Sequence, residues 1–158
     1  MVVKRKGHSR KSSAQEEPMI VSTHSDQITT CKPGTYALVF RSTIHQQIHV
    51  GQLGALSIRE GVYIYVGSGF GPGGIRARIK HHCRISPSPH WHVDYLRQVL
   101  PIISVWYSHD PERKEHHWAT TLMELPGAEI PLPRFGASDC RCKTHLFYFT
   151  EAPLPTEI

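Results

Sequence analysis

No stretch of this 158-residue sequence approaches the roughly 18 to 20 consecutive apolar residues that a helix needs to cross a bilayer. The basic start of the chain is not followed by the apolar segment of a signal peptide, so we expect a cytoplasmic protein. Apolar residues make up 39% of the chain and charged residues 20%, which is a little polar for a compact domain. The length therefore fits one domain, with parts of the chain outside its core.

Cysteine is scarce, with four residues in a chain long enough to bury a core of its own. Disulfide frameworks belong mainly to small exported proteins, so reduced thiols or metal ligands are favoured here. Cys140, Cys142 and His145 could hold zinc, although one residue between two ligands is a short spacing for a structural zinc site. The two cysteines could equally be small buried residues of a turn. A fourth zinc ligand would come from Cys83, His90 or His92.

Acidic residues are fewer than basic ones, 13 against 18, which gives a formal charge of +5 and a pI near 9.2. Twelve histidines could add positive charge beside a polyanion. Phosphates are the natural partner of such a surface, although many soluble domains are this basic without touching nucleic acid.

The two ends of the chain lack apolar periodicity. Residues 1–31 are predicted to be a disordered basic tail and residues 151–158 a disordered C-terminal tail, because neither can offset its ordering entropy by burial. Residues 32–150 then form the folded domain. Basic residues of the first tail could grip phosphates or simply be solvated. They are Lys4, Arg5, Lys6, Arg10 and Lys11.

Hydrophobic patterns and turn signals predict an α+β fold in which helices flank a small three-stranded antiparallel sheet. The run at residues 35–40 is predicted to form an antiparallel hairpin with residues 61–67. In the second run, side chains alternate between the two faces of the strand, so Tyr65 lies on the opposite face from Ile64 and Val66. Arg78 and His82 share one face of a basic helix. Asp110 caps a helix that carries Glu115 on its inward face. Strands are predicted at 35–40, 44–50, 61–67, 102–107 and 145–149, and helices at 75–83, 90–100 and 110–125.

Two tripeptides carry a family resemblance. Gly34-Thr35-Tyr36 on one predicted strand and Tyr65-Val66-Gly67 on the next resemble the signature of GIY-YIG nucleases. A glycine-rich loop then leads to Arg78-Ile79-Lys80-His81-His82, which is similar to the arginine helix of homing endonucleases and excision-repair nucleases. The resemblance implies a GIY-YIG-like fold.

The closest likeness is to the DUF123, or Uri-type, branch of that superfamily, and it covers about residues 33–149. Residues 90–96 and 135–146 extend the match beyond the tripeptides. Two features depart from the superfamily pattern. A long excursion at residues 41–61 separates the tripeptides, and the sequence contains no asparagine, so Ser138 or His145 would replace the usual late one.

The resemblance implies a metal-dependent endonuclease with five catalytic residues. Glu115 would hold Mg²⁺ or Mn²⁺, since one carboxylate suits a hard ion that keeps most of its waters. Arg78 would hold the scissile phosphate, and His82 could donate to a phosphate or a leaving oxygen. Tyr36 and Tyr65 would position or activate water. A phenol is a poor base, so we expect the basic surroundings to lower the pKa of one tyrosine or to let it relay a proton.

Other residues would contact phosphate or nucleic acid, with DNA favoured over RNA as the substrate. They are Gly67, Ser68, Arg76, Lys80 and His81. Two alternatives stay open: a nucleic-acid-binding module that retains the fold without turnover, and a zinc-stabilised interaction domain. Each residue also has a plain structural explanation, since Glu115 could lie at the surface and the tyrosines could simply pack in the core.

Overall fold

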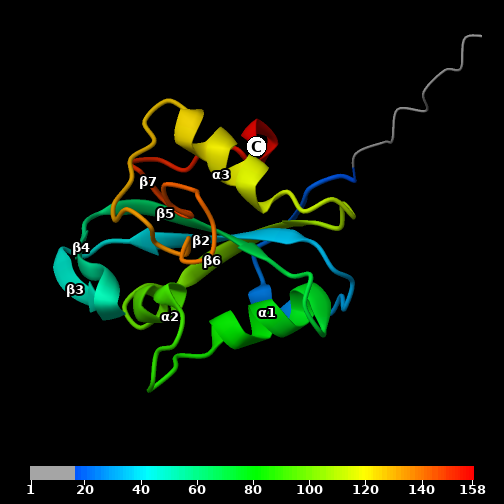
Figure 1. Ribbon diagram of the computed structural model, residues 1–158, viewed down its shortest axis with the longest axis horizontal. Helices are drawn as coiled ribbons and strands as arrows, with labels where there is room; N and C mark the ends of the chain where they lie inside the picture. The colour runs from blue at the N-terminus through cyan, green and yellow to red at the C-terminus, as the bar shows by residue number, and fades with distance from the viewer. Residues whose placement is uncertain (1–16) are drawn as a thin grey trace, which may run out of the picture.

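The computed structural model describes residues 17–158, so the basic cluster predicted at residues 4–11 lies outside the described residues. The described chain is mixed α/β, with a five-stranded antiparallel sheet in the order β1-β6-β2-β5-β7 and a separate hairpin of β3 and β4 (Figure 1). The strands are β1 Ile20–Ser22, β2 Thr35–Ser42, β3 Gln46–Val50, β4 Gly54–Ile58, β5 Gly61–Ser68, β6 Ile102–Ser108 and β7 Leu146–Phe149. The helices are α1 Gly74–Cys83, α2 His92–Arg97 and α3 Glu115–Glu124, with short 3₁₀ turns η1 Ser25–Gln27, η2 Gly51–Leu53 and η3 Pro155–Glu157.

Strands β2 and β5, which were predicted to pair with each other, lie side by side in the middle of the sheet. Their antiparallel register sets Tyr36 opposite Gly67 and Leu38 opposite Tyr65. Because side chains alternate along a strand, Tyr36 and Tyr65 lie on the same face of the sheet. This register is the first feature that brings the two signature tripeptides together.

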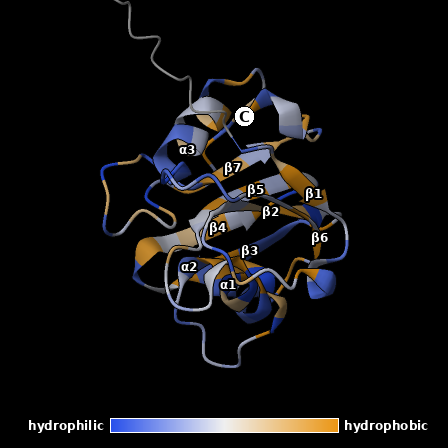
Figure 2. Ribbon diagram, turned by 90° about the vertical axis from the view of Figure 1, so that its right-hand side faces the viewer, coloured by the Kyte–Doolittle hydropathy of each residue, from blue (hydrophilic) through white to orange (hydrophobic). Residues whose placement is uncertain are grey.

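Both faces of the sheet are covered. Helices α1 and α2 and the β3–β4 hairpin lie on one side, where Leu38 and Tyr63 are fully buried, and α3 lies on the other (Figure 1). There α3 packs on Val39 and its neighbours through its inward-facing residues Trp118, Ala119 and Leu122. Figure 2 shows the apolar residues concentrated in the strands between these layers. No helix in the described part of the chain is long and apolar enough to cross a membrane.

The prediction of a three-stranded sheet is wrong, because β1 and β7 add a strand at each edge. β1 has only three residues, too few for an alternating pattern to stand out, and it pairs with β6 through Ile20 and Tyr107. Structure also extends into both predicted tails. Within residues 17–31, η1 precedes the buried Ile28, and at the C-terminus η3 leads to Ile158, which packs against the α3 layer.

Helix α3 starts later than predicted. The carboxylate of Asp110 accepts a hydrogen bond from the backbone N–H of Glu112 at 2.9 Å, which closes a turn rather than capping a helix. The backbone N–H of Lys114 instead donates to the hydroxyl of Thr35 at 3.1 Å, and the helix begins at the next residue. Glu115 is therefore the first residue of α3, next to the beginning of strand β2.

Candidate active site

A cleft of about 660 Å³ lies where these elements meet. All five residues predicted to be catalytic line it, although they come from two strands and two helices. They are Tyr36 on β2, Tyr65 on β5, Arg78 and His82 on α1, and Glu115 on α3. The structure therefore brings together residues that lie up to about 80 positions apart along the chain.

Tyr36 and His82 form a buried hydrogen-bonded pair at the floor of the cleft. The hydroxyl of Tyr36 lies 2.7 Å from Nε2 of His82, and each residue is only 2% exposed. The other ring nitrogen of His82, Nδ1, is buried and has no hydrogen-bond partner among the described residues. The ring of His82 also lies 5.7 Å from that of Trp91 and 6.3 Å from that of Tyr65, so aromatic groups enclose it.

The prediction that the basic surroundings lower the pKa of a tyrosine is wrong for both phenols. Burial raises the pKa of Tyr36 well above its ordinary value, and the neighbouring Tyr65 raises it further while Arg78 acts in the opposite direction. Burial also raises the pKa of Tyr65, with Glu115 adding to the rise. Both hydroxyls are therefore protonated at neutral pH, and the expectation of a proton relay stays as the alternative.

His82 is neutral over the physiological range. Burial, with help from the electrostatic influence of His81 and of Arg78, lowers the pKa of His82 to about 3, while Asp94 opposes the change. The hydroxyl of Tyr36 and Nε2 of the neutral His82 share one hydrogen bond, whose direction depends on the tautomer of the imidazole. In the tautomer with its proton on Nδ1, Nε2 accepts from the hydroxyl of Tyr36.

This lowered pKa predicts a loss of stability in mild acid. The unfolded chain protonates its histidine near pH 6.5 and the folded chain only near pH 3, so the contribution of His82 is complete above pH 6.5 and is lost as the pH falls. From pH 7 to pH 5 the free energy of unfolding should drop by roughly 2 kcal/mol more in the wild type than in His82→Gln. Urea denaturation at the two pH values measures this difference, and parallel drops in both proteins would contradict the assignment.

Arg78 is held beside the cleft by an aromatic ring. Its guanidinium lies 4.8 Å from the centre of the Trp91 ring, a cation–π contact that orients the planar fork. Trp91 is fixed in turn by Asp94, whose carboxylate accepts the backbone N–H groups of His90 and Trp91, each at 3.0 Å. Burial tends to raise the pKa of Asp94, but these hydrogen bonds and a third from His81 lower it, so Asp94 is ionised. A buried carboxylate thus anchors the loop that positions Arg78.

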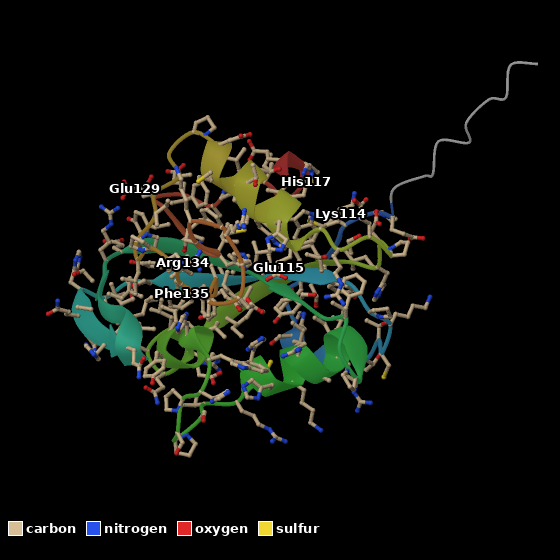
Figure 3. The ribbon with its side chains drawn as sticks, viewed as in Figure 1. Lys114, Glu115, His117, Glu129, Arg134 and Phe135 are labelled. Atoms are coloured by element: carbon tan, nitrogen blue, oxygen red, sulfur yellow. The ribbon has the colours of Figure 1, made fainter. Side chains whose placement is uncertain are left out.

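Glu115 points from the first turn of α3 toward the sheet, and Figure 3 shows it beside the strands. Its side chain is 23% exposed, so water can reach it. One carboxylate oxygen, Oε1, lies 2.8 Å from Nδ1 of the buried His145, a close approach without the direction of a well-formed hydrogen bond. Glu115 is thus a half-buried carboxylate with an oxygen left to bind a cation.

Two glycines make room for the tyrosines. A methyl group at Gly67 would collide with the ring of Tyr36, and one at Gly136, where φ is +69°, would lie 2.7 Å from the ring of Tyr65. The missing side chain at Gly67 therefore lets the ring of Tyr36 approach strand β5 closely.

Gly67→Ala should displace Tyr36 and destabilise the protein by about 1–3 kcal/mol, the usual cost of overpacking a core. Gly71→Ala is the matched control, because the nearest atom to its methyl group would be Nη2 of Arg78 at an ordinary 3.4 Å. Urea denaturation of both variants measures the effect. Equal stability of the two would mean that the Tyr36 ring does not depend on this close approach.

The other residues predicted to bind nucleic acid lie in three different places. Ser68 lines the cleft, and its buried hydroxyl has no hydrogen-bond partner among residues 17–158. Arg76 and Lys80 are exposed on the outer side of α1, away from the cleft. His81 lies 3.1 Å from Asp94 and belongs to the support of the Trp91 loop.

Sequence reasoning missed the aromatic and basic residues of the cleft rim. Arg113 lies 4.9 Å from the centre of the Phe70 ring, and both residues line the cleft. Asp139 lines it too, next to Ser138, one of the two predicted substitutes for asparagine. The sequence signal for Phe70 was its place inside a glycine-rich loop, where a large apolar side chain has no core to enter.

A second cluster lies behind Glu115. Ligand atoms of His116, Cys140, Cys142 and His145 all lie within 4.8 Å of one another, so His116 takes the fourth position. The fourth ligands predicted from the sequence are wrong. Cys83 donates to the hydroxyl of Ser25, His92 accepts the backbone N–H of Gly136 at 2.8 Å, and His90 lies outside the cluster.

Comparisons with known proteins give one finding. The family described as "Domain of unknown function DUF123" matches residues 35–157, which includes every residue that lines the cleft. No curated protein and no solved structure matches the chain significantly.

Proposed function

Starting from the fact that the chain belongs to the DUF123 family, we propose that it is a metal-dependent endonuclease of GIY-YIG type, which hydrolyses phosphodiester bonds in DNA. The observation that carries this proposal is the meeting of Tyr36, Tyr65, Arg78, His82 and Glu115 in one cleft. An activated water, a cationic fork and a carboxylate are the parts that this hydrolysis needs.

The donor set fits one hard divalent cation. Glu115 offers a carboxylate oxygen in a cleft that water can enter, and Mg²⁺ or Mn²⁺ is typically held by one or two carboxylates with waters completing its shell. Asp139 lines the same cleft and offers a second carboxylate for the same cation. When bound, the ion would neutralise charge on the phosphate and lower the pKa of a water.

The buried tyrosine and histidine support a proton relay. In the tautomer with its proton on Nδ1, Nε2 of His82 accepts the hydroxyl of Tyr36 at 2.7 Å, so the phenol proton can pass to Nε2 as a water loses its proton to the oxygen of Tyr36. The relay avoids a free phenolate, which the raised pKa of Tyr36 disfavours. A negative phosphate in the cleft raises the pKa of His82 and so helps it to take the proton. Tyr65, also protonated, orients water by donating its hydroxyl hydrogen.

Arg78 and Arg113 supply the positive charge of the cleft. Each guanidinium lies against an aromatic ring, Trp91 for Arg78 and Phe70 for Arg113. The planar fork of Arg78 can donate two parallel hydrogen bonds to phosphate oxygens, and its ring contact limits the side-chain entropy that this costs. The arrangement supports one nick for each binding event, because the cleft contains one such set of residues.

A panel of single-stranded, duplex, flapped and branched DNA and RNA, incubated with Mg²⁺ or Mn²⁺, tests the proposal. We expect cleavage of at least one DNA substrate that EDTA stops and added Mg²⁺ or Mn²⁺ restores. Salt-sensitive binding without cleavage of any substrate would refute the endonuclease and favour the non-catalytic binding module.

A further inference from the structure

We propose that His116, Cys140, Cys142 and His145 form a structural zinc site that also positions Glu115. Two close contacts within the cluster each join a histidine to a cysteine. Nε2 of His145 lies 3.4 Å from the sulfur of Cys140, and Nδ1 of His116 lies 2.9 Å from the sulfur of Cys142. Two thiols and two imidazoles are the Cys₂His₂ set that tetrahedral Zn²⁺ takes in structural sites.

The spacing of these atoms suits an ion. Zinc bonds of about 2.3 Å to sulfur and 2.0–2.1 Å to nitrogen place tetrahedral sulfur and nitrogen ligands about 3.5 Å apart. The His145–Cys140 distance of 3.4 Å already matches this value. The His116–Cys142 pair, at 2.9 Å, is closer and needs to open by a few tenths of an ångström, which the exposed side chain of His116 permits. Two thiolates balance the charge of Zn²⁺, so the loaded site is neutral.

The short Cys-x-Cys spacing is no obstacle here. Cys140 and Cys142 lie in a bent segment that follows a turn at residues 138–139, not in a strand, so the two cysteines are not forced to opposite sides. The segment between Leu132 and Thr144 has no helix or strand, and one ion would fasten it to α3 through His116. An open hollow of about 530 Å³ beside the cluster, lined by α3 and by residues 140–144, gives the ion a route of entry.

His145 connects this site to the cleft. Its Nε2 faces Cys140, whereas its Nδ1 faces Oε1 of Glu115 at 2.8 Å. A zinc ion on Nε2 leaves the proton on Nδ1, the atom that faces the carboxylate, which is the carboxylate–histidine–zinc arrangement. His145 is then a positioning residue for Glu115. This coupling rests on the proposed function, whereas the zinc site itself does not.

Metal analysis of the full chain tests the zinc site without any activity assay. Purified protein should contain about one equivalent of zinc, and Co²⁺ exchanged into it should give the visible bands of a tetrahedral thiolate site. Cys142→Ser and His116→Ala should each weaken Zn²⁺ binding by at least about tenfold. Cys31→Ser and Cys83→Ser are the matched controls, because both cysteines lie outside the cluster, and they should keep full zinc content. Wild-type protein that neither contains zinc nor binds Co²⁺ with thiolate bands overturns the proposal.

Two further measurements separate this proposal from the proposed function. Glu115→Gln should retain its zinc whether or not the wild type cleaves DNA, since Glu115 is not a ligand of the zinc ion. Binding of Mn²⁺ by the wild type and by Cys142→Ser, measured from the electron paramagnetic resonance of free Mn²⁺, tests the coupling. We expect about 10-fold weaker Mn²⁺ binding in the zinc-free variant, and equal affinities would overturn the positioning role of His145.

Discussion

Glu115→Gln is expected to reduce cleavage by roughly 10³-fold, about 4 kcal/mol of transition-state stabilisation. Glutamine keeps the size of the side chain and an oxygen for the contact with His145, but it lacks the negative charge that holds a hard cation. The loss should therefore appear in kcat and in the Mn²⁺ concentration needed for activity, while DNA binding in EDTA stays close to that of the wild type. Single-turnover cleavage across a Mn²⁺ titration measures both quantities.

Glu124→Gln is the matched control, because Glu124 is exposed at the opposite end of the same helix. It removes the same charge from α3 without touching the cleft, so its cleavage rate should equal that of the wild type. A Glu115→Gln enzyme that stays within about threefold of the wild type at saturating Mn²⁺ would mean that this carboxylate has no part in binding the catalytic metal.

Arg78→Lys should lower kcat by roughly 10² to 10³-fold although the positive charge is kept. Lysine cannot donate two parallel hydrogen bonds to a phosphate, nor lie flat on the ring of Trp91 as the guanidinium does at 4.8 Å. Ground-state binding should change little, because the long-range attraction to phosphate is retained. Cleavage rates and equilibrium binding of one DNA substrate, measured at the same salt concentration, separate the two effects.

Arg76→Lys provides the comparison on the same helix. Arg76 is exposed and lies outside the cleft, so the exchange should leave kcat unchanged. If Arg78→Lys and Arg76→Lys behaved alike, Arg78 would contribute only to the basic surface of α1, and the transition-state role assigned to its planar fork would be wrong.

The strands and the helix that carry the cleft could be predicted because their signals are local. The β-branched and aromatic runs of β2 and β5 and the glycines before α1 each indicate an element without reference to the rest of the chain. Strands β1 and β4 were not predicted, for two different reasons. β1 has three residues, and β4 lies in a stretch whose glycines indicate a break. A sheet edge depends on pairing partners far along the chain, which no local pattern contains.

The sequence could predict that Tyr36, Tyr65, Arg78, His82 and Glu115 meet in one cleft, but it could not predict their electrostatics. The family resemblance places Arg78 and a metal ion beside the tyrosines and so favours a lowered pKa, whereas burial dominates in the folded chain and raises the pKa of Tyr36. The phenol of Tyr36 is buried because it packs against α1. The position of a residue within a strand does not predict such packing. The donor–acceptor pair of Tyr36 and His82 follows from the same packing.

His116 shows the limit of spacing arguments for metal sites. Cys140, Cys142 and His145 lie close along the chain and suggest a site, but the fourth residue lies 26 positions before Cys142, on another element. Only the packing of α3 against the loop brings it near. A pair of histidines directly after Glu115 was the available signal, and it does not distinguish a ligand from a solvated surface.

The most direct test is a crystal structure of the protein with Mn²⁺ and a DNA strand in which a methylene group replaces the scissile bridging oxygen, so that the modified phosphate cannot be hydrolysed. The anomalous signal of Mn²⁺ should lie within about 2.0–2.3 Å of a carboxylate oxygen of Glu115. The modified phosphate should accept hydrogen bonds from the guanidinium of Arg78 and lie next to the hydroxyls of Tyr36 and Tyr65. A Mn²⁺ ion bound elsewhere, with the phosphate outside the cleft, would contradict the idea that these residues act together on one phosphodiester.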